Sequence, residues 1–514
     1  MSSKVTSIGL KGLEGYRIQV EVQVKEGLET MIIVGLPDAS VKESKERVAA
    51  ALHSLGFSLV DMKVTINLSP AEQKKNGPLF DLAIAVGVLK SGNFLKESIP
   101  KDSGFIGALS LDGSVLPVEG MLAAILAAKK LQLRKLFLPY DPTIPNIEIT
   151  GLELVYIETL QDVIDVLRGQ QLLPFIQPQK TLKESQPILR DFNQVIGHEY
   201  AKRALEIAAS GEHYVLMEGP PGCGKSLLAE TFQSIIPQLS EEGQLEKVSL
   251  YQIAGASYHS PSEPPYRHPH HSASSVSIIG GGTYPKPGEV SLAHRGVLFL
   301  DELGEFSKKT LDMLRQPLES KTVTISRVHS TVTYPANFIF IAAMNPCPCG
   351  YFGSNDHYCT CSEKQIKAYK NRVSGPILDR FDILLTLQAV NLKGHDFKGI
   401  DSSEDIKKRV ASARENQYNR YGKEICNGTV PFEQLIQSSP LTPKQQYDLQ
   451  QVSSKQGLSN RVQIKIIRLA RTIADIKGEV LISDEDLKEA MFLRKLAPPT
   501  HFSLTGEANK PLYR

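Results

Sequence analysis

Short β-rich runs alternate with longer apolar stretches of helical character through the first 170 residues. The expected strands are residues 16–24, 31–34 and 64–68, and the expected helices are residues 41–55, 82–89 and 121–131. This mixture predicts an α+β domain over residues 1–170.

A change in composition follows this region. Residues 170–186 are rich in Pro, Gln and Lys, so residues 171–190 are expected to form a linker. A second globular unit is predicted over residues 191–390, and the C-terminal domain covers residues 391–514. A chain of 514 residues accommodates about three domains.

The second unit contains the motif GPPGCGKS, which fits the phosphate-loop pattern G-x-x-x-x-G-K-[ST]. An apolar strand is expected before it at residues 214–217, and a helix after it at residues 227–236. Glycines let backbone N–H groups approach phosphate oxygens, and the lysine reaches the terminal phosphates. The motif therefore predicts an ATP site lined by Gly219, Pro220, Pro221, Gly222, Cys223, Gly224, Lys225 and Ser226.

A second apolar strand, residues 297–300 in GVLFLDE, ends in two acidic residues. Its continuous apolar run is typical of a buried parallel strand, and open α/β sheets bind ligands at the C-terminal ends of such strands. Asp301, together with Ser226, is expected to hold Mg²⁺, and Glu302 is expected to polarise the attacking water. The two motifs predict an ATPase.

Composition adds few constraints. The formal net charge is +2 and 41% of the residues are hydrophobic, so any basic surface for nucleic acid must be local. Apolar runs are shorter than a membrane span, and residues 1–15 lack the apolar region of a signal peptide. We expect a cytoplasmic protein with no membrane partner.

Four of the six cysteines form the pattern C-x-C, nine residues, C-x-C. Four thiolates in two close pairs can form a tetrahedral Zn²⁺ site, which would order this loop. The alternatives are four reduced cysteines or a redox pair. The candidate zinc ligands are Cys347, Cys349, Cys359 and Cys361, whereas Cys223 and Cys426 stand apart as packing residues.

Residues 260–282 form a Pro-, Gly- and Ser-rich insertion between the two nucleotide motifs. His268, His270 and His271 lie in it without the spacing of a regular metal site. We interpret this segment as a substrate-facing loop; metal binding is the alternative.

Two segments of the N-terminal region, KKNGPLFDLAIAVGVL and GALSLDGSVLPVEGMLAAILAAKKLQLRKLFLP, resemble the proteolytic domain of Lon, which has a ribosomal S5 domain 2-like fold. In this resemblance Leu79 occupies the position of the nucleophilic serine and Leu122 that of its lysine partner. Leucine can neither attack a carbonyl nor remove a proton. The resemblance implies the scaffold without the catalytic dyad.

Residues 191–226 resemble the opening of AAA+ modules, and further landmarks follow in the order of that family. Asn345 matches sensor 1, which orients the attacking water. Arg380, in GPILDRFD, matches the arginine finger that enters a neighbouring subunit's ATP site, with a salt bridge to Asp379 or Asp382 as the alternative. Arg461 matches sensor 2 at the start of a lid helix, with a solvated helix charge as the alternative.

Residues 321–334 alternate β-branched and polar residues and predict a hairpin. Lys321, Arg327 and His329 are expected to project from it. In related helicases such hairpins line a central pore, where six copies concentrate positive charge on DNA. An ordinary sheet edge with solvated charges is the alternative.

Together, these motifs resemble the magnesium-chelatase-like AAA+ ATPases of the YifB/ComM family. The resemblance implies an α/β protein with three parts: a Lon-protease-like α+β domain, an AAA+ P-loop α/β core and a C-terminal helical lid. It also implies a homo-hexamer that uses ATP to move on branched or single-stranded DNA as a branch-migration helicase. A chelatase-like remodeller acting through a partner, and an assembly scaffold, are the alternative functions.

Overall fold

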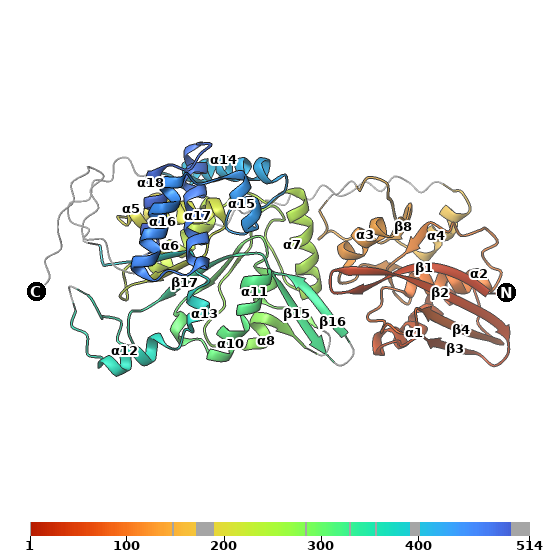
Figure 1. Cartoon of the computed structure of the whole chain (residues 1–514). Helices are drawn as coiled ribbons and strands as arrows, with labels where there is room; N and C mark the ends of the chain where they lie inside the picture. The colour runs from red at the N-terminus through yellow and green to blue at the C-terminus, as the bar shows by residue number, and fades with distance from the viewer. Residues whose placement is uncertain are drawn as a thin grey trace, which may run out of the picture.

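The computed structural model describes residues 2–145, 149–170, 190–282, 285–327, 330–354, 357–390 and 401–494. An N-terminal domain lies at one end of the molecule, and the remaining elements form a larger body beside it (Figure 1). Of the expected linker 171–190, only Arg190 belongs to the described residues. Among the helices of the described ranges, none has the length and apolar character needed to cross a membrane.

The N-terminal domain is built on a four-stranded sheet of order β1-β2-β4-β3. β1, β2 and β4 are antiparallel neighbours, whereas β3 pairs with β4 in parallel. The expected strands 16–24, 31–34 and 64–68 are confirmed as parts of β2, β3 and β4. The bounds are β1 Ser2–Lys11, β2 Glu14–Glu26, β3 Thr30–Val34 and β4 Met62–Ser69.

Helix α2 (Asp81–Ser91) packs on β1 and β2, and α1 (Ala39–Ser54) packs on α2. Every residue from 81 to 89 is buried, which explains why this helix is apolar on all sides. Asp81 is the one buried charged residue of α2. It is compensated by Arg47, whose Nε lies 2.7 Å from the Asp81 carboxylate.

A second, parallel sheet of order β5-β8-β9 completes the N-terminal domain. Its strands are β5 Ser103–Phe105, β8 Lys135–Leu138 and β9 Glu153–Tyr156, a short pair is formed by β6 Ala108–Leu109 and β7 Val115–Leu116, and the helices are α3 Met121–Lys130 and α4 Leu160–Leu167. The expected α+β character and all three expected helices are confirmed.

The two positions that correspond to the Lon dyad are part of the domain's interior. Leu79 is 5% exposed and Leu122 is fully buried. The backbone amide of Leu122 donates to Oε1 of Gln252, 3.1 Å away in the larger body. Leu122, at the position that matches the catalytic lysine of Lon, therefore takes part in the contact between the N-terminal domain and the larger body.

The larger body contains a five-stranded parallel sheet of order β11-β14-β17-β10-β18. The strands are β10 Val215–Glu218, β11 Tyr266–Arg267, β14 Val297–Leu300, β17 Ile339–Met344 and β18 Ile383–Thr386. β14 and β17 are buried along their whole length, as expected for strands covered on both faces. The C-terminal ends of β10, β17 and β14 meet at one edge of the sheet.

Helices surround this sheet and connect its strands. They are α5 Glu199–Gly211, α6 Lys225–Thr231, α7 Glu241–Ala254, α8 Ser275–Ile279, α9 Glu289–Leu292, α10 Lys308–Met313, α11 Arg315–Ser320, α12 Glu363–Lys370 and α13 Gly375–Leu378. Three short 3₁₀ helices cover Phe192–Gln194, Phe232–Ile235 and Leu303–Glu305. The expected helix after the P-loop is confirmed as α6 and the 3₁₀ turn that follows it.

Two antiparallel pairs lie outside the main sheet. β12 (Gly280–Gly281) pairs with β13 (Lys286–Pro287), and β15 (Thr322–Arg327) pairs with β16 (Ser330–Pro335) to form the expected hairpin. The hairpin extends from the body towards the N-terminal domain (Figure 1). One face buries Val323, Ile325, Val332 and Tyr334 and carries exposed Arg327 at its end, and the other exposes Thr324, Ser326, Thr331 and Thr333.

Within residues 401–494, five helices form the C-terminal lid: α14 Ser403–Tyr421, α15 Phe432–Ser438, α16 Pro443–Gln456, α17 Asn460–Lys477 and α18 Asp484–Phe492. α17 packs against α5, α14 and α18, so the lid is continuous with the core. Lys465 of α17 strengthens this junction, because its ammonium lies 2.9 Å from Oδ1 of Asp382 and donates to the carbonyls of Arg380 and Phe381.

The N-terminal domain contacts the larger body through α3, which packs on α7. Gln252 of α7 donates to Asp141 and Thr143, and Lys286 lies 3.1 Å from the carboxylate of Glu119. The tight turn between β1 and β2 meets the hairpin: a Cβ added at Gly12, whose φ is +63°, would lie 2.4 Å from Val332. The part of the hairpin where Val332 pairs with Ile325 therefore contacts the N-terminal domain as well as the larger body.

Candidate functional site

The P-loop connects β10 to α6, as its sequence motif predicts. Gly222 and Gly224 have φ of +76° and +89°, values that favour glycine. The loop therefore turns tightly enough to present its backbone at the edge of the sheet. Cys223 of the loop is buried and is 2% exposed.

Lys225 and Asn345 meet at this edge, although they are far apart in the sequence. The Lys225 ammonium donates to the carbonyls of Gly219 (2.7 Å) and Pro220 (2.9 Å) and to Oδ1 of Asn345 (3.1 Å). Burial lowers the pKa of Lys225. The contact follows from strand order, since β10 carries the P-loop and its neighbour β17 ends beside Asn345.

Ser226 and the two acidic residues after β14 complete the cluster. Ser226 Oγ donates to Oδ2 of Asp301 at 2.7 Å. Glu302 has a left-handed backbone, with φ of 50°, and its amide donates to Oδ1 of Asp301 at 2.8 Å. Such a conformation costs a non-glycine residue roughly 1–3 kcal/mol and is concentrated at functional sites. The hydroxyl and carboxylate oxygens here are ligands that suit Mg²⁺.

A residue whose role the sequence did not reveal, His271, contacts Glu302. Its Nδ1 lies 3.1 Å from Oε2 of Glu302, and its ring lies 4.0 Å from that of His270. The strand β11 delivers this loop beside β14, which brings His271 to the nucleotide site, and the interpretation of the histidine segment as substrate-facing stays a prediction. His268 and His270 are exposed.

Arg380 and Arg461 lie close to one another, on the same carboxylate. Arg380 Nη2 donates to Oε2 of Glu319 at 2.6 Å, and Arg461 Nη2 lies 3.7 Å from Oε1 of Glu319. In the isolated subunit both arginines therefore form ion pairs, with Glu319 rather than with Asp379 or Asp382. These contacts are to α11 and not to the P-loop cluster.

The prediction that Lys321 projects from the hairpin is wrong. Lys321 lies just before β15 and its ammonium covers the ring of buried Tyr214 at 4.3 Å, where the Tyr214 hydroxyl accepts its hydrogen bond. Burial lowers the pKa of Lys321 to about 8. Arg327 is exposed, as expected, and Nε donates to the Gly282 carbonyl at 3.2 Å. His329 lies outside the described residues.

The four clustered cysteines bring their sulfur atoms into one small volume. Cys347 Sγ lies 3.3 Å from that of Cys349 and 3.7 Å from that of Cys359, and the amide of Cys349 donates to Cys361 Sγ at 3.4 Å. All four sulfur atoms lie within 4.8 Å of one another, and none is in a disulfide. Hydrogen bonding from the Tyr351 backbone lowers the pKa of Cys349, whereas burial and the neighbouring thiols raise the pKa of Cys359 and of Cys361. This cluster can hold a metal ion.

The cysteine loop packs directly on the P-loop. Gly350, at φ +87°, lies so close that an added Cβ would be 2.6 Å from Cδ of Pro221. A larger residue would have to displace one of the two loops. The order of the cysteine loop is therefore coupled to the position of the phosphate-binding backbone.

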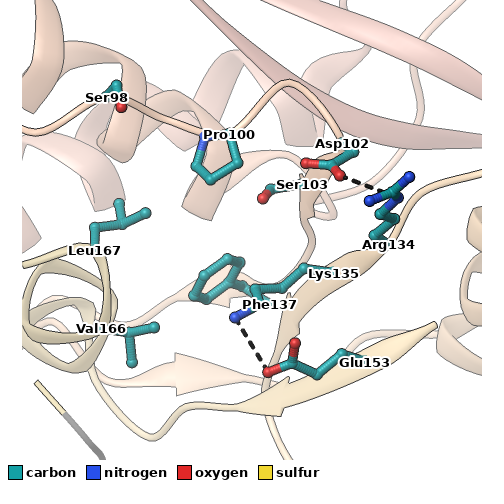
Figure 2. Close-up of a pocket in the computed structure, with 10 residues that line it drawn as sticks. All are labelled: Ser98, Pro100, Asp102, Ser103, Arg134, Lys135, Phe137, Glu153, Val166 and Leu167. Carbon is teal, nitrogen blue, oxygen red and sulfur yellow. Dashed lines mark ion pairs between the residues drawn. The ribbon is translucent and has the colours of Figure 1, made fainter. Parts of the chain in front are cut away.

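A separate pocket of about 330 Å³ opens in the N-terminal domain, near α4 and the sheet β5-β8-β9 (Figure 2). Its basic groups are neutralised, because Arg134 lies 3.6 Å from Asp102 and Lys135 lies 3.1 Å from Glu153. The lining residues all come from the N-terminal domain, so this pocket is distinct from the P-loop cluster.

The parallel sheet, the P-loop, the paired carboxylates and the helical lid define a AAA+ ATPase. Three family models match the chain: "Magnesium chelatase, subunit ChlI" over residues 191–394, "Subunit ChlI of Mg-chelatase" over 20–142 and its C-terminal model over 400–494. AAA+ membership implies ATP and Mg²⁺, and the oxygen donors of Ser226 and Asp301 fit that requirement.

Similarity to full-length relatives specifies the family further. The chain is 38% identical to competence protein ComM of Haemophilus influenzae over 94% of this chain and 96% of that protein. It is 37% identical to YifB of Escherichia coli over 94% of this chain and 95% of that protein. The N-terminal part is 30% identical to Lon protease 2 of Bacillus subtilis over 24% of this chain and 22% of that protein. The chain belongs to the ComM/YifB family of magnesium-chelatase-like AAA+ ATPases.

The separation between nucleotide binding and water activation gives a direct test of this site. Lys225→Ala should abolish nucleotide binding, because the ammonium is the cation of the phosphate cradle. Glu302→Gln should bind ATP and fail to hydrolyse it, because an amide cannot polarise the water as a carboxylate does. Fluorescent-nucleotide binding and phosphate release measure the two steps. Lys309→Ala, at an exposed lysine, is the control; hydrolysis by Glu302→Gln at the parent rate would refute the assignment.

Proposed function

We propose that this protein is an ATP-driven motor that assembles as a homo-hexameric ring and moves on DNA, acting as a branch-migration helicase. The family resemblance supports this function, and one structural observation carries it: Arg380 and Arg461 lie together on Glu319 rather than on the P-loop cluster. An ATP site that receives these cations from a neighbouring copy would account for their separation from the residues that hold phosphate.

Within one chain, Lys225 and the P-loop backbone bind the phosphates of ATP, and Ser226 with Asp301 would hold Mg²⁺. Bound Mg²⁺ neutralises part of the charge on the phosphates. Glu302 polarises the attacking water, and Asn345, already hydrogen-bonded to Lys225, orients it. Arg380 of a neighbouring copy would stabilise the charge that develops on the transferred group.

The backbone around Arg380 is fixed well enough for such a role. Lys465 donates to the carbonyl of Arg380, and Lys465 and Arg494 both donate to the carbonyl of Phe381. Burial disfavours the charged form of Asp382, but the Lys465 ammonium and His213 outweigh it and hold the pKa of that carboxyl below its usual value. In a ring, ATP phosphates would replace Glu319 as the anion that Arg380 meets.

Arg380→Ala should bind ATP almost normally and hydrolyse it about 10³- to 10⁵-fold more slowly, because the finger acts mainly in the transition state. Mixing Arg380→Ala with Lys225→Ala subunits should restore part of the turnover, since each variant lacks a different half of a shared site. Phosphate release from mixed rings, with co-assembly checked by light scattering, measures this. Absence of recovery in co-assembled rings would contradict a shared site.

DNA is proposed to contact the exposed face of the β15–β16 hairpin. That face presents a row of threonine and serine hydroxyls, groups that commonly contact phosphates, and Arg327 is exposed at the end of β15, on the face that carries Ile325. Six copies in a ring would multiply this single positive charge around the axis. Lys321 is excluded from this surface by its burial on Tyr214.

Arg327→Ala should weaken binding of four-way DNA and flatten its salt dependence, because one phosphate contact is lost per subunit. ATP binding should stay unchanged, because the P-loop residues that hold the phosphates do not contact the described residues of the hairpin. Fluorescence anisotropy over a range of salt concentrations measures both quantities. Lys130→Ala, which removes an exposed cation from the N-terminal domain, is the matched control. If branched DNA neither binds nor stimulates hydrolysis, a chelatase-like remodeller that acts through a partner becomes the better function.

We also propose that the cysteine cluster holds a structural Zn²⁺. Four thiolates are the ligand set of closed tetrahedral zinc sites, and the clustering of the four sulfur atoms within 4.8 Å of one another suits one ion. Because Gly350 of this loop packs on Pro221, a zinc ion that orders the cysteine loop would also stabilise the P-loop.

Purified protein should contain about one Zn²⁺ per chain, and Cys359→Ser with Cys361→Ser should lose it. Removal of the metal should weaken nucleotide binding, because the loop that packs on Pro221 loses its order. Elemental analysis and nucleotide titration check the two effects. Cys426→Ser, at a buried cysteine outside the cluster, should keep the metal. Metal-free protein from chelator-free preparations would refute the zinc assignment.

A further inference from the structure

His271 belongs to a loop that reaches the catalytic carboxylate. Its Nδ1 lies 3.1 Å from Oε2 of Glu302. The side chain of Glu302 is 52% exposed and that of His271 is 34% exposed. The contact is an ion pair when the imidazole is protonated, because the carboxylate then faces a cation. The ring of His271 is further confined by Phe306, whose ring meets it edge-on at 6.4 Å.

Residues 268–275, here called the histidine loop, are anchored at both ends. At the entry, Arg267 forms two hydrogen bonds with Glu289, of 2.6 and 2.7 Å. At the exit, Ser274 caps α8 by accepting from the Ser277 amide, and Ser275 is 3.2 Å from Thr310. The position of His271 therefore depends on the packing of α8.

The elements after the histidine loop contact the hairpin. α8 leads into β12, and the next residue, Gly282, accepts the hydrogen bond from Arg327. Ile278 of α8 and Ile325 of the hairpin lie in the same buried cluster, and the Tyr334 hydroxyl donates to the Pro285 carbonyl at 2.6 Å. One continuous segment thus touches Glu302 at one end and the hairpin at the other.

We propose that His271 is a positioning residue for Glu302, and that the segment from the histidine loop to Gly282 transmits the state of the hairpin to ATP hydrolysis. The first part rests on the AAA+ ATPase site, and the transmission rests on the proposed function as a DNA motor. A phosphate that draws Arg327 away from Gly282 releases one end of the segment. The other end of the segment then fixes the position of His271, and His271 fixes the Glu302 carboxylate that polarises water.

The sign of the effect follows from the role of the contact. Glu302 is half-exposed, so without His271 its carboxylate samples several rotamers, most of them unable to align water with the phosphate. Misplacement by about 1 Å can cost on the order of 10²-fold in rate. ATP binding depends on the P-loop and stays unchanged.

His271→Ala should lower kcat by about tenfold or more, with the ATP dissociation constant within about twofold of the parent. His271→Asn should recover much of the loss, because its amide nitrogen can donate from near the position of Nδ1. His259→Ala, at an exposed histidine before the loop, should hydrolyse at the parent rate. Unchanged kcat in His271→Ala, or an equal loss of kcat in His271→Asn, would overturn the positioning role.

Transmission is measured with four-way DNA. DNA should stimulate hydrolysis by the parent protein, whereas His271→Ala should bind the DNA with unchanged affinity and show a stimulation factor near one. Equal stimulation of His271→Ala and the parent would overturn the transmission. If DNA fails to stimulate the parent, the DNA-motor proposal and the transmission both fail, and the basal kcat comparison still decides the positioning role.

Discussion

The parallel pairing of β10, β17 and β14 is the constraint on which the nucleotide site depends. β17 lies between the other two strands, with Met344 opposite Glu218 and Ala342 opposite Leu300. This register brings the P-loop, Asn345 and Asp301 to one edge. A sheet covered by helices on both faces requires apolar strands, so the polar groups are concentrated where the strands end.

The junction between the core and the lid controls the position of Arg380, the candidate arginine finger. Asp382 is buried, and its charge is sustained by Lys465 of α17 at 2.9 Å. Separating the two partners of such a pair leaves a buried charge uncompensated, which is costly in free energy. The pair therefore resists movement at the junction. Arg380 is two residues away, so its backbone position follows the lid. Movements of the lid and of the candidate finger are thereby linked.

The N-terminal domain is similar to part of Lon protease 2, and the position that matches the Lon lysine lies at the contact with the larger body. Leu79 and Leu122 fill the interior, and the Leu122 amide is bound by Gln252 of α7. α7 belongs to the AAA+ core, and the β1–β2 turn touches the hairpin at Val332. The domain thus contacts the element that is proposed to meet DNA.

Local sequence by itself determined much of this protein. The glycines and lysine of the P-loop, the apolar strand before Asp301 and the C-x-C pairs carry their chemistry in short spacings, and the expected strands and helices of the N-terminal domain follow from local periodicity. Tertiary structure alone decided which distant groups meet. Glu319 holds Arg380 across 61 residues, Tyr214 buries Lys321 across 107, and His271 reaches Glu302 because β11 lies beside β14. Charges and imidazoles carry no periodic signal, and their partners are set by strand order and helix packing, so the sequence could name these residues but not their contacts.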